Sequence, residues 1–260
     1  MITDEELQII EIRLQQYQNL FVENGRLPHM QRLKQEHCLR VAENSLHIAQ
    51  DLDQNHKQQN LVKAIGLLHD VGRFQQWKQY ATFSDELSVD HGELGATILK
   101  ETLLIKHLPA SIQDLIVHSV RFHNKKDIPT TISSNEFEQL KIIREADRLD
   151  IILVIIKAIE DGDIYDHPQI LWNADLYGPA TPRVRESLEQ GTSINYKYLQ
   201  TMSDWILLHL QWIEQLYFHG STQLVQSRNY LGRLQQLMPD TSKETTLCFT
   251  HAKAHLQSSL

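Results

Sequence analysis

The chain has 260 residues, of which 41% are hydrophobic, and a formal net charge of −8 at pH 7. This length and apolar content are enough for a sizeable core, whereas the negative charge argues against a general nucleic-acid binder. The two cysteines, Cys38 and Cys248, are too few for a disulfide framework or a zinc site built on thiolates, and they fit a reducing compartment.

The first residues, MITDEELQII, are acidic and amphipathic. A signal peptide instead has a basic segment followed by an apolar run, so we expect none here. The sequence also lacks a run of about 18 apolar residues, so we expect no membrane span. These features predict a cytoplasmic protein.

Helical periodicity runs along most of the chain. Glycine (10) and proline (7) are few, and apolar residues recur every three or four positions, as on a buried helix face. The sequence therefore predicts an all-α protein. The predicted helices cover residues 4–23, 30–53, 60–72, a stretch that begins near Asp90, and residues 110–123, 135–160, 198–218 and 221–237.

One segment between helices is long and rich in aromatic residues. We predict that residues 74–89 are irregular but ordered, because loops longer than about 12 residues tend to be functional or disordered. Their aromatic side chains would either stack on a base or sugar or anchor the loop to the core. Asp90, followed by Glu93, resembles a capping box and predicts the start of the next helix.

A polar stretch at residues 161–197 contains several glycines and prolines and predicts a division of the chain. We expect a helical core with an N-terminal helix at residues 1–165 and a C-terminal helical extension packing on it at residues 166–260. Apolar positions in 205–238 would pack on the core or form a homodimer. The polar residues 239–260 predict a frayed tail.

Five ionisable side chains lie on helix faces that should be buried: His37, His69, His91, His123 and Asp147. An unpaired buried carboxylate is costly, but a nearby cation reverses that cost. Imidazole and carboxylate are the ligands expected for Zn, Mn, Fe, Co or Ni, and carboxylate also suits Mg. The pattern therefore predicts a metal site. Adjacent residues on a helix point in different directions, so Asp70 and His69 would not face the same point. Asp70 would therefore bridge to a second side of the cluster.

Most of the 14 histidines should be ordinary, since a lone buried histidine is more often a hydrogen-bonded core residue than a ligand. The histidines expected to have no site role are His47, His56, His107, His167, His209, His219, His251 and His255. Asp150 is expected to be solvated or to support the site from outside.

The residues and their contexts resemble the HD superfamily of metal-dependent phosphohydrolases. The pattern of that family is a histidine, a His-Asp pair and a distant aspartate. Here it reads His37 in EHCLRVAENSLHIA, His69-Asp70 in GLLHDVGR and Asp147 in IREADRLD. The resemblance implies an HD-domain helical core in which these four residues hold one metal ion.

Many members of the family bind a second metal through two further histidines. The segments VDHGELGATIL and SVRFHN resemble those that supply them, which implies His91 and His123, with His118 as a weaker rival. Asp70 would bridge the two ions. The segment RFQQWKQYATFSDELSVDH resembles a bacterial HD subgroup of mostly undefined substrate.

The resemblance implies a hydrolase that uses divalent ions, expected to be two and drawn from Mn, Fe, Co, Ni, Zn or Mg, to activate water on a small phosphate ester such as a nucleotide. Asp70 and Arg73 are the predicted catalytic residues. The cations predicted to bind the phosphorylated substrate are Arg73, Arg121, Lys125 and Arg148. Two alternatives remain: an HD-type di-iron oxygenase, and a non-catalytic metal-containing binder or sensor.

Overall fold

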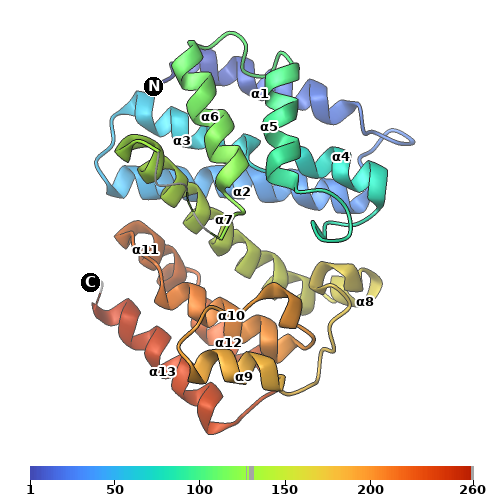
Figure 1. The fold of residues 1–260 in the computed structure, drawn as a ribbon, viewed down its shortest axis with the longest axis vertical. Coiled ribbons are helices and arrows are strands. Elements are labelled where there is room, and N and C mark those ends of the chain that lie inside the picture. Colours follow the sequence, from blue (N-terminus) through green and yellow to red (C-terminus); the bar gives the residue numbers. More distant parts are fainter. Residues whose placement is uncertain (127, 129–131, 259–260) are drawn as a thin grey trace. The chain divides into compact units, whose positions relative to one another are not determined.

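The computed structural model describes residues 1–126, 128 and 132–258, and it is helical throughout (Figure 1). Within these residues no β-strand forms, and the only extended pairings are two isolated bridges, Glu23 with Arg26 and Asp175 with Thr201. The predicted all-α fold is therefore confirmed. In the same part of the chain, no helix is both long enough and apolar enough to cross a membrane.

The chain forms two compact units, residues 1–150 (unit 1) and 151–260 (unit 2). This division falls inside a long helix, before the polar stretch in which the sequence places it. The assignment of a core to residues 1–165 and an extension to residues 166–260 stays a prediction about domain organisation.

Unit 1 begins with six complete helices and contains the first part of a seventh. They are α1 (Asp4–Asn19), α2 (His29–Asp51), α3 (His56–Leu68), α4 (Val71–Tyr80), α5 (His91–Glu101), α6 (Ala110–Phe122) and α7 (Ser134–Glu160). Helices α2 and α3 pack together, α4 packs against α5, and α5 packs against α6 (Figure 1). The core between them is made of aliphatic side chains such as Val41, Ile65, Ile116 and Ile143.

Polar side chains define where several of these helices begin. Thr3 and Glu6 form a reciprocal capping box at the start of α1, because each side chain accepts a hydrogen bond from the other residue's backbone N–H. Asp90 caps α5 as predicted, accepting from the backbone N–H groups of Gly92 and Glu93. The Glu93 carboxylate, however, pairs with Arg121 rather than completing a capping box.

The predicted loop at residues 74–89 is wrong in its first half, since α4 continues to Tyr80 and ends at Ala81 in the left-handed conformation. The helix forms there because Val71 and Phe74, three positions apart, are both buried on one face. The predicted third helix, 60–72, is wrong at its end for a related reason. Asp70 has φ −102° and ψ 20°, so the chain breaks between α3 and α4 at the His-Asp pair.

A glycine makes the approach of α4 to α5 close enough for the two helices to share a site. A Cβ atom at Gly72 would overlap the backbone of His91 and of Gly95. Only glycine therefore allows the start of α4 to lie directly against the start of α5. This contact brings Asp70, which precedes α4, next to His91, which begins α5.

Unit 2 contains the rest of α7 and a set of shorter helices. They are α8 (Asp163–Asp166), η1 (Pro168–Leu171), α9 (Pro182–Glu189), η2 (Tyr196–Tyr198), α10 (Met202–Glu214), α11 (His219–Ser227), α12 (Tyr230–Leu237) and α13 (Lys243–Ser258). Helix α10 is buried on nearly all sides and is the centre of this unit, with α13 packed against it.

Two predictions for unit 2 are wrong. The single helix predicted at residues 221–237 is broken at Asn229, which adopts the left-handed conformation with φ 51°. The predicted frayed tail is mostly the helix α13. Its apolar face is sparse but real, because Ala252 and Leu256, four positions apart, are both buried.

Candidate metal centre

Six ionisable side chains of unit 1 converge on one point. These side chains come from the middle of α2, the α3–α4 junction, the first residue of α5, the end of α6 and the middle of α7. We call this set the His/Asp cluster; it consists of His37, His69, Asp70, His91, His123 and Asp147. All are buried except Asp147, whose side chain is 16% exposed. The structure thus brings together all six residues that the sequence proposes as ligands.

The four histidines meet as two pairs through their Nε2 atoms. The Nε2 atoms of His37 and His69 are 3.2 Å apart, and those of His91 and His123 are 3.0 Å apart. We call His37 and His69, with the nearest Asp70 oxygen, the first half of the cluster. His91 and His123, with the other Asp70 oxygen, are the second half. Each half presents two imidazole nitrogens at a spacing suited to one shared cation.

Asp70 lies between the two halves and offers one oxygen to each. Its Oδ2 atom is 3.5 Å from Nε2 of His37 and 3.6 Å from Nε2 of His69. Its Oδ1 atom is 3.4 Å from Nε2 of His91 and 3.7 Å from Nε2 of His123. The break in the helix at Asp70 allows this, because adjacent residues within a continuous helix do not face one point.

Asp147 lies on the open side of the first half. Its Oδ1 atom is 3.1 Å from Nε2 of His37 and 3.6 Å from Nε2 of His69. Its side chain is the most exposed of the six, so it marks the side from which solvent reaches the cluster.

Outer hydrogen bonds fix the orientation of every imidazole. The Nδ1 atom of His69 donates to the carbonyl oxygen of Gly66, and that of His123 donates to the carbonyl of Val120, both at 2.7 Å. A carbonyl can only accept, so in the neutral ring Nδ1 carries the hydrogen and Nε2 presents a lone pair.

In His37 and His91, the acceptor next to Nδ1 is a carboxylate and not a carbonyl oxygen. His37 Nδ1 lies 2.7 Å from Asp150, whose side chain is fully buried and also accepts two hydrogen bonds from Arg40. His91 Nδ1 lies 2.6 Å from Asp85. Partners of this kind orient metal-binding histidines in proteins. Asp150 is thus a buried supporting residue and not a solvated one.

The pKa values reflect this crowding of charges. Burial would raise the pKa of Asp70, but the charges of Lys34 and His69 hold it well below its usual range. Burial and the charge of Arg73 lower the pKa of His91 to about 4, although the hydrogen bond that His91 donates to Asp85 acts in the opposite direction. Burial also lowers the pKa of His69. In His37, hydrogen bonds to Asp147 and Asp150 outweigh burial and raise the pKa.

This donor set fits divalent metal ions. Two nitrogen ligands about 2.1 Å from one ion lie about 3.0–3.4 Å apart for angles between about 90° and 109°. The observed separations of 3.0 and 3.2 Å fall in this range. Lone pairs that face each other at this distance repel unless a cation lies between them. Imidazole with carboxylate suits Zn, Mn, Fe, Co or Ni.

Two charged residues beside the cluster were not identified from the sequence. Lys34 places its Nζ atom 2.8 Å from Asp70 Oδ2, and Asp85 contacts His91 as described. Lys34 carries a weak signal, because it lies three positions before His37 on the same helix face. Asp85 lies in the segment that resembles the HD subgroup, but it is on an irregular loop, so no periodicity marks this position.

The cations proposed for substrate binding are placed in different ways. Arg73 lies beside the cluster, with Nε 3.5 Å from Asp70 Oδ1 and Nη1 3.0 Å from Asp85. Arg121 pairs with Glu93, and Lys125 pairs with Asp90. Arg148 is half-buried on α7.

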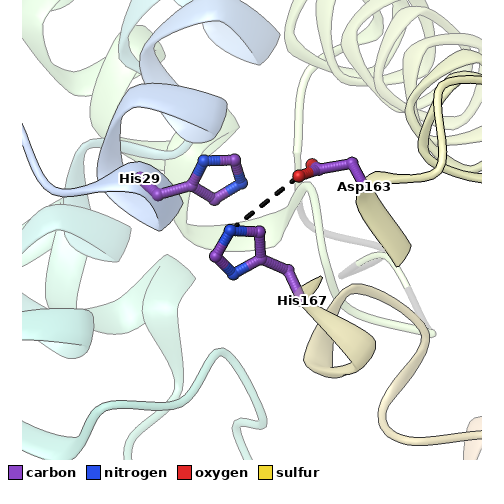
Figure 2. Close-up of side chains that lie close together, drawn as sticks. All are labelled: His29, Asp163 and His167. Carbon is purple, nitrogen blue, oxygen red and sulfur yellow. Dashed lines mark ion pairs between the residues drawn. The ribbon is translucent and has the colours of Figure 1, made fainter. Parts of the chain in front are cut away.

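Histidines outside the cluster have simpler surroundings. His118, the rival of His123, pairs with Glu136 at 3.0 Å and is not part of the cluster. In unit 2, His167 pairs with Asp163 one helical turn earlier at 3.8 Å (Figure 2). His209 is fully buried, and neither of its ring nitrogens has a hydrogen-bond partner among the described residues.

Comparison with known proteins identifies the part of the chain that carries the cluster. The family model of the HD domain matches residues 35–155, which include all six cluster residues. Searches of curated proteins and of solved structures found no match. The residues that the family model matches end shortly after Asp150 and cover most of unit 1 after α1. The chain therefore carries an HD domain at residues 35–155.

Proposed function

We propose that this protein is a metal-dependent phosphohydrolase in which the His/Asp cluster holds two divalent ions. One observation carries the proposal: Asp70 directs one carboxylate oxygen to each of two histidine pairs, at 3.4–3.7 Å. A single-ion site would need only one of these pairs. In this assignment His37, His69, Asp70 and Asp147 hold the first ion, and Asp70, His91 and His123 hold the second.

Bound ions would supply a water molecule of lowered pKa and neutralise charge on phosphoryl oxygens. The protein's own residues have supporting tasks. Asp150 and Asp85 hold the imidazoles of His37 and His91 in the orientation that presents Nε2. Asp147, on the open side, is the ligand nearest to incoming solvent.

Lys34 and Arg73 are the residues best placed to bind the phosphate of a substrate. Both lie beside Asp70, and both side chains are 14% exposed. Lys34 Nζ and Arg73 Cζ each lie within 5.6 Å of the centre of the Phe83 ring. The Arg73 Nη1 group is engaged by Asp85 and the carbonyl of Phe83. The Lys34 Nζ atom pairs with Asp70 Oδ2.

Other parts of the assignment rest on the family resemblance and the sequence. We propose a small phosphorylated substrate, a nucleotide or related metabolite, and a cytoplasmic enzyme of the bacterial HD subgroup. Arg121 and Lys125 are weaker candidates for substrate contact because carboxylates already pair with them. Arg148 remains a candidate from its place one residue after Asp147.

The test combines metal analysis with a panel of phosphate esters. Protein purified without added metal is analysed for bound ions, then assayed for phosphate release with Mn, Co, Ni or Fe supplied. We expect two ions per chain and hydrolysis of at least one ester class. Asp70→Ala should abolish both, whereas Asp114→Ala, an exposed aspartate of α6, should change neither.

Two results would contradict the proposal. Retention of metal and hydrolysis by Asp70→Ala would remove the bridging role. Tightly bound iron with oxygen consumption and no phosphate release on the panel would replace hydrolysis by the oxygenase chemistry of HD-type di-iron enzymes.

A further inference from the structure

The two halves of the cluster are supported from outside in very different ways. In the first half the supporting carboxylate is Asp150, which lies within α7 and is 0% exposed. In the second half it is Asp85, which lies on the loop of residues 81–90 and is 29% exposed. The same imidazole Nδ1 contact is thus made once from a packed helix and once from a partly solvated loop.

Asp150 has a rigid setting. Arg40 on α2 donates to both of its oxygens, from Nε at 2.7 Å and from Nη2 at 3.0 Å. Two-point contacts of this kind fix a carboxylate in place. Since α2 also carries His37, the ligand and its support are tied together by two helices of the core.

Asp85 depends on side chains from three elements. It accepts hydrogen bonds from Arg73 at 3.0 Å, from Gln76 at 2.9 Å and from Asn124 at 3.1 Å, in addition to His91. Gln76 is fully buried, and its Nε2 atom also lies 2.9 Å from Ser88 Oγ and from the carbonyl oxygen of Val89, at the end of the loop. The two hydrogens of this amide are thus shared among three acceptors. The loop is therefore fastened to α4 by side chains and not by regular secondary structure.

From this contrast we infer that Asp85 is a positioning residue which sets the metal affinity of the second half independently of the first, so that the second ion is the exchangeable one. This inference rests on the proposal that the cluster holds two ions. Opening the 81–90 loop would withdraw Asp85 from His91 without disturbing Asp150. The affinity of the second half for its ion would then depend on the residues that hold the 81–90 loop in place.

The position of Phe83 extends this control to the two cations beside the cluster. Phe83 lies two residues before Asp85 on the same loop, beside the cations Lys34 and Arg73. Whatever binds at these cations therefore contacts the loop that carries Asp85. By linkage, any effect that binding there has on loading of the second ion is matched by an equal effect of that ion on the binding.

The test is a titration of the metal-depleted full chain with Co²⁺ alone. Calorimetry and visible absorption monitor the binding. The wild type should show two sites. Asp85→Asn should weaken only the second by about 10–100-fold, the usual effect of losing an outer partner of a metal-binding histidine. Asp150→Asn, the same substitution at the other half, should weaken the tighter site instead.

Further variants separate positioning from general damage. Asn124→Ala removes one anchor of Asp85 but keeps the Asp85–His91 contact, so it should produce a smaller loss at the second site. Glu86→Gln, an exposed change on the same loop, should bind Co²⁺ as the wild type does. Asp85→Glu should restore part of the lost affinity.

The outcome is independent of any substrate. Equal weakening of both sites by Asp85→Asn, or unchanged affinity at both in a folded variant, would overturn the inference while leaving hydrolysis open. A wild type that binds a single Co²⁺ would overturn it as well. Two sites with the expected selective loss, but no phosphate release on any ester, would uphold the inference and count against hydrolysis.

Discussion

Unit 1 and unit 2 each bury histidines completely, but in opposite surroundings. In the His/Asp cluster every Nδ1 atom has an acceptor and every Nε2 atom faces a carboxylate oxygen or another imidazole. In unit 2, His209 of α10 lies between the rings of Trp205 and Trp212, with centroid distances of 6.0 and 5.2 Å. Neither of its nitrogens has a partner among the described residues.

This difference separates a site from a core position. Burial lowers the pKa of His209 to about 3, as it lowers that of His91 to about 4. A depressed pKa therefore does not distinguish the two settings. What distinguishes them is the set of fixed acceptors behind Nδ1 and of carboxylates in front of Nε2, which only the cluster has.

The largest expected effect is the loss of a cluster histidine, and it tests the contrast between the His/Asp cluster and His209. His37→Ala should reduce phosphate release by more than about 100-fold, because an ion contributes several kcal/mol of charge stabilisation and each 1.36 kcal/mol is tenfold in rate. It should also lower the metal content per chain, measured by elemental analysis. His209→Phe is the control and should leave both quantities unchanged; a loss of metal in that variant would place His209 in a site.

A smaller effect is expected at Lys34, beside the cluster. Lys34→Met keeps most of the alkyl stem but removes the charge beside Asp70, so KM for a phosphate ester should rise by about tenfold, within the range for a hydrogen bond to a charged group. Steady-state kinetics at saturating metal measures this. Lys63→Met removes a lysine that pairs with Glu11 instead and should leave KM unchanged. A fall in metal content with unchanged KM would make Lys34 part of the metal site.

Sequence reasoning reached the cluster because its signal is periodic. His37 with Val41 and Ile48, or His123 with Val120 and Ile116, lie on one helix face whatever the tertiary fold. The packing of these faces then brings the histidines together. Their roles as metal ligands, together with Asp70 and Asp147, stay predictions that the assays above decide.

The features that sequence reasoning missed depend on tertiary structure or on local backbone geometry. The break at Asp70 is a matter of one residue's φ and ψ, and no periodicity marks it. Asp85 reaches His91 only because Gln76 and Arg73 hold an irregular loop against α4. The helix α13 was not predicted because its buried face has few apolar residues. Its stability depends on packing against α10, which the sequence does not reveal.

The last expected effect concerns the stability of the fold alone and leaves activity unchanged; it lies at His209. The unfolded chain binds a proton at this side chain near pH 6.5, whereas the folded state does so only near pH 3. Stability contributed by the neutral ring is therefore complete above pH 6.5. It falls by about 1.4 kcal/mol per pH unit between these values, since the unfolded state gains the proton first.

His209→Phe removes this titration and two unpaired buried nitrogens, so it should stabilise unit 2 by about 1–2 kcal/mol at neutral pH and by more at pH 5. Urea unfolding followed by tryptophan fluorescence reports on this unit, because three of the four tryptophans, Trp172, Trp205 and Trp212, lie in it. His251→Phe, a change at an exposed position of α13, should keep the wild-type dependence on pH. If His209→Phe keeps that dependence too, or loses stability, then the ring nitrogens have partners in solution and the contrast with the cluster fails.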